Sequence, residues 1–138
     1  MHNTEIYFPM LALFALTVLV ALRLVMVRAK ALRAREVHPR YFRALQGEAP
    51  EYMVAAARCY GNLLELPVLF YVVCLALLAT GVRDDLYLIL AWAFVVLRVI
   101  QAAIHLTYND PRHRALAFIL GFAVLATLWI RLGFRLMA

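Results

Sequence analysis

The sequence predicts an all-α integral membrane protein, a bundle of four transmembrane helices in one domain that spans residues 1–138. Hydrophobic residues make up 67% of the chain and charged residues 16%, whereas soluble domains have about 45–50% and about 25% respectively. Four apolar stretches each approach or exceed the roughly 20 residues that a helix needs to cross a bilayer. No strand-like alternation competes with them, and no room is left for a separate soluble domain.

The first two spans are expected at residues 6–27 and 53–80, with Arg23 near the inner end of the first. We expect the first span to be retained rather than cleaved as a signal peptide. Glu5 precedes it in place of a basic segment, and no small-residue cleavage site follows it. The second span is long enough to tilt in the membrane or to project from it.

The last two spans are expected at residues 86–106 and 115–135, and the sequence between spans has turn chemistry. Residues 81–85 predict a tight turn between the second and third spans. Residues 108–111 read Tyr-Asn-Asp-Pro, in which Asn and Asp bond their own backbone and Pro stops a helix. The two arginines near the end of the fourth span can extend outward to the headgroups.

Basic residues concentrate on one side of the predicted bundle. The turn between the third and fourth spans carries Arg112 and Arg114, whereas the opposite side has Arg83 beside two aspartates, then Arg131 and Arg135. The segment between the first two spans holds most of the others: Arg23, Arg28, Lys30, Arg33, Arg35, Arg40 and Arg43. The positive-inside rule therefore predicts that both basic loops face the cytosol and that both termini lie outside it.

The net charge of +6 follows from this topology. Basic residues that lie against a membrane meet anionic lipid headgroups, so we expect lipid as a partner. Few aromatic residues are interleaved with them, so we expect no nucleic-acid partner. The predicted location is a bacterial inner membrane, with the chain crossing it several times.

The second span carries three polar residues in an otherwise apolar run. Arg58, Asn62 and Glu65 are spaced i, i+4 and i+7, which places a cation, an amide and an anion on one helix face. Ionisable residues at membrane depth are costly, so by default they indicate a functional site. This stripe is expected to face protein or a water-filled cleft.

The third span carries a second polar stripe, Arg98, Gln101 and His105, spaced i, i+3 and i+7. Because the second and third spans are antiparallel, the two stripes overlap in depth. We expect them to form one polar cleft that opens to the cytosol, roofed by Arg112 and Arg114.

Two interpretations of this cleft remain open. Several cations with one acid and one amide suit a small, net-anionic, peptide-like ligand such as glutathione, since Arg forks bind carboxylates and Glu binds an ammonium group. Alternatively, Arg98 and Glu65 form a structural ion pair that holds the helices together.

Metal and disulfide chemistry are not expected. Cys59 and Cys74 lie fifteen residues apart on one predicted helix and cannot bridge each other. The histidines are scattered and do not have the spacing of a metal site.

The polar stripes, together with the length and the four spans, resemble the MAPEG family, membrane-associated proteins in eicosanoid and glutathione metabolism. The resemblance covers essentially the whole chain, and it rests on Arg98 in the third span, an arginine that opens the fourth, and a motif in the second, Arg58-x-x-x-Asn62-x-x-Glu65-Leu66-Pro67. It implies a homotrimer that binds glutathione as co-substrate between neighbouring subunits, near the cytosolic side. Arg58, Asn62 and Glu65 would hold the polar ends of glutathione.

The resemblance also implies an activity, glutathione-dependent transfer to, or peroxide reduction of, lipophilic electrophiles. An arginine at the start of the fourth span, Arg112 or Arg114, would stabilise the glutathione thiolate. An arginine at the end of the first span, Arg28 or Arg33, would contact the ligand. Arg98 belongs to the family signature in the third span. From the polar stripe and its neighbourhood, Gln101, His105 and Tyr108 are also expected to contact the ligand.

Two departures leave the activity open. His105 stands where several family enzymes have Tyr, with Tyr108 three residues further on, and Leu66 follows the motif glutamate where some members have Tyr. A non-catalytic scaffold or binding module with the same fold is therefore the alternative. A small transporter or channel subunit is a weaker interpretation, because we expect four unbroken helices.

Overall fold

The described part of the chain, residues 5–82 and 84–137 of a computed structural model, is helical and contains no strand. Arg83 lies outside these residues. Four helical segments are long and apolar enough to cross a membrane, with α3 and α4 counted together, and this confirms the predicted fold class. The helices are α1 (Tyr7–Arg33), α2 (Tyr41–Ala44), α3 (Glu51–Leu63), α4 (Leu66–Thr80), α5 (Asp85–Leu106) and α6 (Pro111–Met137).

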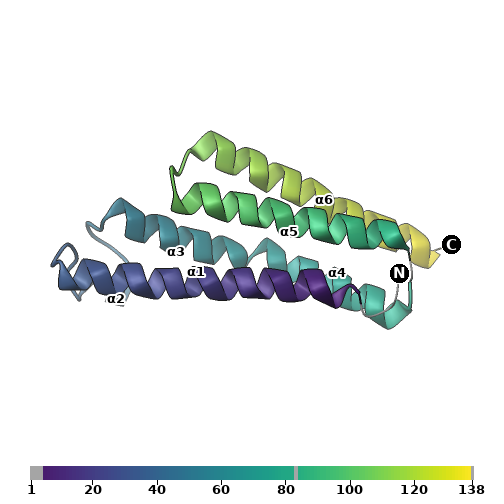
Figure 1. Ribbon diagram of the computed structural model, residues 1–138, viewed down its shortest axis with the longest axis horizontal. Helices are drawn as coiled ribbons and strands as arrows, with labels where there is room; N and C mark the ends of the chain where they lie inside the picture. The colour runs from purple at the N-terminus through teal and green to yellow at the C-terminus, as the bar shows by residue number, and fades with distance from the viewer. Residues whose placement is uncertain (1–4, 83, 138) are drawn as a thin grey trace.

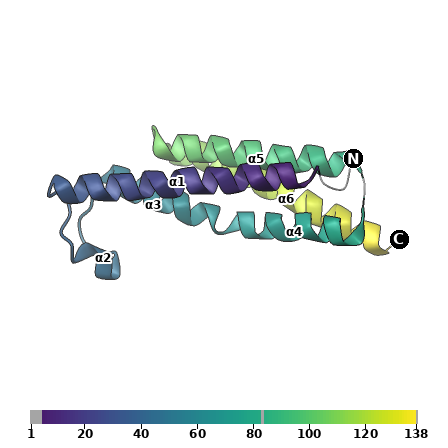
Figure 2. The ribbon, with the colours of Figure 1, turned by 60° about the horizontal axis from the view of Figure 1, so that its bottom comes forward.

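The long helices run side by side in an elongated bundle (Figure 1). The most extensive contact joins α5 to α6, and α1 packs mainly against α3. The beginning of α1 and the end of α6 lie at one end of the bundle, whereas the connection from α1 to α3 and the turn from α5 to α6 lie at the other (Figure 1). The short α2 projects from that second end (Figure 2). The two basic loops thus share one end, called here the basic end.

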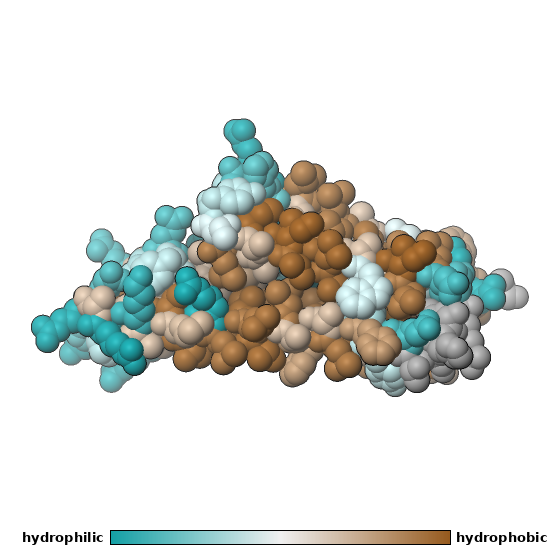
Figure 3. Space-filling model, in the orientation of Figure 1, coloured by the Kyte–Doolittle hydropathy of each residue, from teal (hydrophilic) through white to brown (hydrophobic). Residues whose placement is uncertain are grey.

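The outer surface explains why the bundle belongs in a membrane. Apolar side chains cover the middle of the molecule, and hydrophilic side chains gather towards its ends (Figure 3). Large apolar residues such as Leu19, Val96 and Ile119 are mostly exposed, away from the helix ends. Such a continuous belt suits lipid, and soluble monomers rarely expose one. The protein is an integral, multi-pass membrane protein.

The expectation of four unbroken helices is wrong, because the second crossing is interrupted. The helix α3 ends at Leu63, and α4 begins at Leu66, with Glu65 in a non-helical conformation between them (φ −97°, ψ −95°). Pro67 explains the break, since it has no N–H and its ring would clash with the carbonyl of Leu63 four residues earlier. In the first turn of α4, Pro67 loses nothing, because that N–H has no helical partner. The interruption places Glu65 at a bend.

The turn between α5 and α6 has the predicted Asn-Asp-Pro chemistry. Asn109 adopts the left-handed conformation (φ 51°), which Asn tolerates better than most residues. The Asp110 carboxylate accepts hydrogen bonds from the backbone N–H groups of Arg112 (2.8 Å) and His113 (3.2 Å). These bonds hold the pKa of Asp110 below its ordinary value. The carboxylate thus stays charged at neutral pH and fixes the first turn of α6, which carries Arg114.

Candidate functional site

The predicted polar stripe of the third span meets one residue of the other stripe, Asn62, inside the bundle, where α3 faces α5. Asn62 from α3 and Arg98, Gln101 and His105 from α5 line one small cavity. Cys59, Leu63 and Ala102 complete its wall. The cavity has a volume of about 10 Å³, which is close to what a single water molecule needs. In a single chain, Asn62 and the polar stripe of α5 therefore line a small polar core.

The guanidinium group of Arg98 is the centre of this core, and its side chain is only 1% exposed. Its Nη2 donates to the backbone carbonyls of Ala117 and Phe118 on α6, at 3.4 and 3.5 Å. The rings of Phe94 and Phe118 lie 5.2 and 5.6 Å from its Cζ atom, within range of cation–π contact. Among the described residues it has no acidic partner. The carbonyl dipoles and the aromatic rings stabilise the positive charge but do not neutralise it.

Gly121 on α6 makes room for Arg98. A Cβ atom added at Gly121 would lie 2.1 Å from Arg98 Nη2, well inside contact distance. A glycine here therefore allows the guanidinium to reach the α6 backbone. Gly121 was not among the predicted site residues, although a glycine inside an apolar helix is a known signal of close packing.

Several polar atoms around the cavity have no hydrogen-bond partner among the described residues. They are Arg98 Nε, Gln101 Oε1 and both ring nitrogens of His105. A buried polar atom without a partner typically costs about 1–3 kcal/mol, and buried polar atoms usually have partners. The core thus combines an unneutralised cation with free donors and acceptors, and an anionic, hydrogen-bonding ligand matches that combination.

Arg58 and Glu65 lie outside the cavity, with exposed side chains. The alternative ion pair between Arg98 and Glu65 is not formed, because Arg98 turns towards α6. Arg58 lies on the same helix as Asn62, one turn before it. Of the arginines, only Arg98 lines the core cavity together with His105 among the described residues.

A wider pocket of about 460 Å³ opens at the basic end, beside the core. His105 lines both spaces and therefore lies between them. Tyr108 also lines the pocket, and its hydroxyl is hydrogen-bonded to His113 Nδ1 at 3.0 Å. Arg23 of α1 is a further lining residue, although its position in the sequence predicted only a role in membrane topology.

The arginines at the start of α6 differ in how they are held. Arg114 donates from Nη1 to Asn109 Oδ1 at 2.7 Å, and the Nδ2 of Asn109 donates to Glu51 Oε1 at 3.3 Å. Arg114 is thereby fixed in the turn beside the pocket. The side chain of Arg112 is exposed.

The two candidate arginines of α1 lie away from both spaces. Arg28 stacks over the ring of Phe42, 5.7 Å from the centroid, and Arg33 is exposed at the end of the helix. Neither lines the core cavity or the wider pocket. A ligand of this chain alone would therefore not reach them. Among the described residues, no group of acidic, histidine and cysteine side chains is placed to hold a metal ion.

Comparison with known proteins identifies one family. The model of the MAPEG family matches residues 6–134 of this chain. No curated protein and no solved structure matches the chain. The match covers all four crossings and the whole polar core.

Replacing Gly121 with Ala should destabilise the protein, because the new methyl group would displace Arg98. Overpacking of this kind typically costs about 1–3 kcal/mol. Gly133 on the same helix is the matched control, since a Cβ there meets nothing within 4 Å. There, Ala should gain up to about 1 kcal/mol from helix propensity. Thermal unfolding in detergent should place Gly121→Ala below the parent and Gly133→Ala at or above it. Equal effects of the two changes would mean that Arg98 does not need this space.

Proposed function

Because the chain belongs to the MAPEG family, we propose that it is a glutathione-dependent transferase or peroxidase that acts on lipophilic electrophiles within the membrane. The observation that carries this proposal is the buried guanidinium of Arg98, which has no anion beside it among the described residues. A buried charge without a partner costs several kcal/mol. The core cavity has room for about one water molecule, so an anionic ligand of the size of glutathione must widen it or present a carboxylate to Arg98 from outside it. Either arrangement relieves this cost.

Glutathione has the groups that this region lacks. Its two carboxylates suit arginine side chains, which bind carboxylates through two parallel hydrogen bonds. Arg58 and Arg98 supply such forks at different depths, and Asn62 and Gln101 supply amide groups for its peptide bonds. Its ammonium group needs a carboxylate, and Glu65 lies three residues after Asn62, at the bend of the second crossing.

A homotrimer would complete the site. Arg58 and Glu65 are exposed on the membrane-embedded part of a single chain. A charged side chain at the bilayer centre costs about 2.5–3.5 kcal/mol or more, so such residues normally face protein or a water-filled cavity. A neighbouring subunit that covers this face would bury both charges and enclose glutathione between subunits. It would also bring an α1 arginine, Arg28 or Arg33, towards the ligand.

The chemical step starts from the glutathione thiolate. A thiol with a pKa near 8.5 is mostly protonated at neutral pH, and a guanidinium within hydrogen-bond reach favours the nucleophilic thiolate. Arg114 is suited to this role because Asn109 holds it beside the pocket. In conjugation, the sulfur forms a bond to an electrophilic carbon, and the leaving group departs with its electron pair. In peroxide reduction, the sulfur attacks one oxygen and an alcohol leaves after protonation. A second glutathione then releases water and gives the disulfide.

A non-catalytic binding module with the same fold is the second candidate. His105 favours it, because this position lies between the core and the pocket and carries an imidazole where several family enzymes carry a phenol. A transporter was the weaker interpretation because unbroken helices were expected. The break at Glu65 removes that objection. The core cavity beside it, however, has room for about one water molecule in a single chain.

We further propose that the basic end faces the cytosol of a bacterial cell and that both termini lie outside it, because basic loops stay on the cytosolic side. A cysteine placed at Ala49, in the connection between α1 and α3, should be protected from membrane-impermeant maleimide in intact cells. It should become reactive after the inner membrane is permeabilised. Labelling of Ala49→Cys in intact cells would show that the basic end faces outward and that the proposed orientation is wrong.

Arg58→Ala and Glu65→Gln should each weaken glutathione binding at least tenfold, which corresponds to about 1.4 kcal/mol. Each residue is expected to contact an ionised ligand group, and such a hydrogen bond contributes about 1.5–3 kcal/mol. Arg43→Ala is the matched control, because this exposed arginine lies in α2, away from the core. Calorimetry gives the affinities, and native mass spectrometry of the same samples should give the mass of three chains. If both folded variants bind glutathione like the parent, Arg58 and Glu65 have a purely structural role. If the mass is that of one chain, glutathione does not bind between subunits.

Arg114→Ala should raise the pKa of the bound thiol and lower turnover at least tenfold, about 1.4 kcal/mol of barrier. Glutathione affinity should change little, because other groups hold the carboxylates. The thiolate absorbance of bound glutathione near neutral pH is the measurement, and Arg112→Ala is the paired control, since this side chain is exposed. If Arg112→Ala alone loses the signal, the roles of the two arginines are exchanged. If the parent binds glutathione but shows neither thiolate nor conjugation, the binding-module candidate replaces the enzyme.

A further inference from the structure

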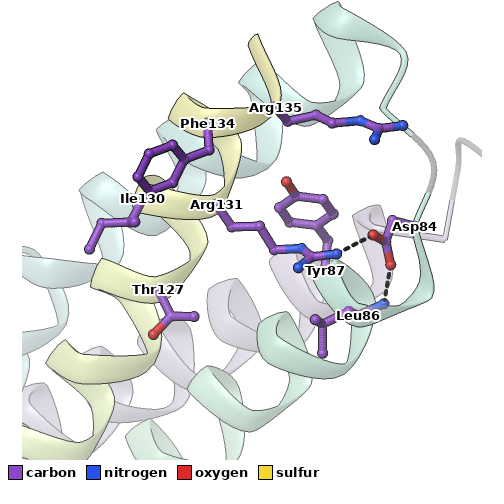
Figure 4. Close-up of a pocket in the computed structure, with 8 residues that line it drawn as sticks. All are labelled: Asp84, Leu86, Tyr87, Thr127, Ile130, Arg131, Phe134 and Arg135. Atoms are coloured by element: carbon purple, nitrogen blue, oxygen red, sulfur yellow. Dashed lines mark hydrogen bonds and ion pairs between the residues drawn. The ribbon is translucent and has the colours of Figure 1, made fainter. Parts of the chain in front are cut away.

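A second polar site lies at the opposite end of the bundle from the basic end, between the beginning of α5 and the end of α6. A groove of about 480 Å³ opens there. Asp84, Tyr87 and Arg131 form its polar side, and Arg135 extends over it from the last turn of α6 (Figure 4). Arg131 is 17 residues from Arg114 along α6, roughly 25 Å at about 1.5 Å per residue. The groove is therefore separate from the proposed glutathione site.

Asp84 fixes the position of Arg131. The Asp84 carboxylate caps α5 by accepting the N–H of Leu86 at 2.9 Å, and its other oxygen accepts from Arg131 Nη2 at 2.5 Å. The Leu86 N–H and the Arg131 guanidinium hold the pKa of Asp84 below its ordinary value, so the carboxylate remains charged at neutral pH. The Arg131 guanidinium also lies over the Tyr87 ring, 5.3 Å from its centroid. Only one edge of the guanidinium is thus committed to the carboxylate.

Two buried donors in this groove have no hydrogen-bond partner among the described residues. Tyr87 is 1% exposed, and its hydroxyl oxygen is buried and unpaired. The Nε of Arg131 is likewise buried and unpaired. Figure 4 shows the Tyr87 hydroxyl directed into the space between Arg131 and Arg135. A donor set of two guanidinium groups and a phenol requires a ligand that has several acceptor oxygens and negative charge.

The other side of the same groove is apolar and faces outward. Ile130 and Phe134 are 60% and 67% exposed, and both line the groove. They lie near the end of a membrane-crossing helix, where the hydrocarbon region gives way to the headgroups. The ligand thus meets cations on one side and a hydrocarbon surface on the other, which is the chemistry of an anionic lipid.

We propose that this groove binds an anionic phospholipid, with its phosphate between Arg131 and Arg135 and an acyl chain along Ile130 and Phe134. The Tyr87 hydroxyl and Arg131 Nε donate to phosphate oxygens, while Asp84 keeps its bond to the opposite edge of Arg131. This assignment does not depend on glutathione chemistry.

Native mass spectrometry of the full-length protein, titrated in detergent with dioleoyl phosphatidylglycerol, tests the proposal. Tyr87→Phe removes the hydroxyl and keeps the ring under Arg131, and Arg135→Gln removes one cation. Neither change touches the ion pair between Asp84 and Arg131. We expect the affinity for the first bound lipid to fall at least fivefold in Tyr87→Phe and at least tenfold in Arg135→Gln. Glutathione affinity should stay at the parent value in both.

Two matched controls and two competitors decide the outcome. Tyr71→Phe on α4 and Arg43→Gln on α2 make the same chemical changes elsewhere, and both should bind lipid like the parent. Dioleoyl phosphatidylcholine, whose headgroup has no net charge, should bind more weakly, and inorganic phosphate should not displace the bound lipid. Losses in the controls as large as in the groove variants would overturn the site. Displacement by inorganic phosphate, or parent-like lipid binding by Tyr87→Phe and Arg135→Gln, would also overturn it.

Discussion

One constraint organises the polar interior of this bundle, the placement of an arginine inside a membrane protein without an acidic partner among the described residues. Arg98 is buried between α5 and α6, where its hydrogen bonds to described residues go to two backbone carbonyls. That arrangement needs a glycine at position 121, and two phenylalanine rings lie beside the guanidinium. Gln101 and His105 also have polar atoms without a partner in the described part of the chain. Burying an unpaired charge costs several kcal/mol of stability, and packing alone does not offset this. We therefore infer that Arg98 serves to bind an anionic ligand.

The sequence was sufficient to predict the four-helix membrane fold and the meeting of Asn62 with the polar face of α5. Both predictions follow from strong regularities, apolar length and helical periodicity. The direction of Arg98 was not predictable in the same way. Its turn towards α6 depends on the space above Gly121, a property of two packed helices that periodicity on one helix does not describe. The break at Glu65 was readable in principle, since Pro67 stood in the sequence, but an otherwise apolar run concealed it.

The arginines at the two ends of the molecule have different partners. At the groove opposite the basic end, Arg131 has a carboxylate partner in Asp84 and lies near the end of its helix. At the basic end, Arg114 donates to the neutral side chain of Asn109, and Arg58 is exposed without an ion pair among the described residues. The end where Arg131 is paired with Asp84 suits a structural and lipid-binding role. The basic end, where positive charge is in excess, suits a ligand that carries negative charge. Arg58 and Glu65 are exposed on a single chain, and this suits a subunit interface around that ligand.

Calorimetric titration of the purified protein with glutathione, repeated at increasing salt concentration, tests the central claim most directly. The account predicts saturable binding with a defined ratio of glutathione to chains. It also predicts only a modest loss of affinity with salt, because charges in a desolvated core are screened much less than surface charges. Absence of saturable heat up to millimolar glutathione, at two temperatures, would contradict the account. So would affinity that vanishes at moderate salt, because it would place the ligand on the exposed basic loops and not in the polar core.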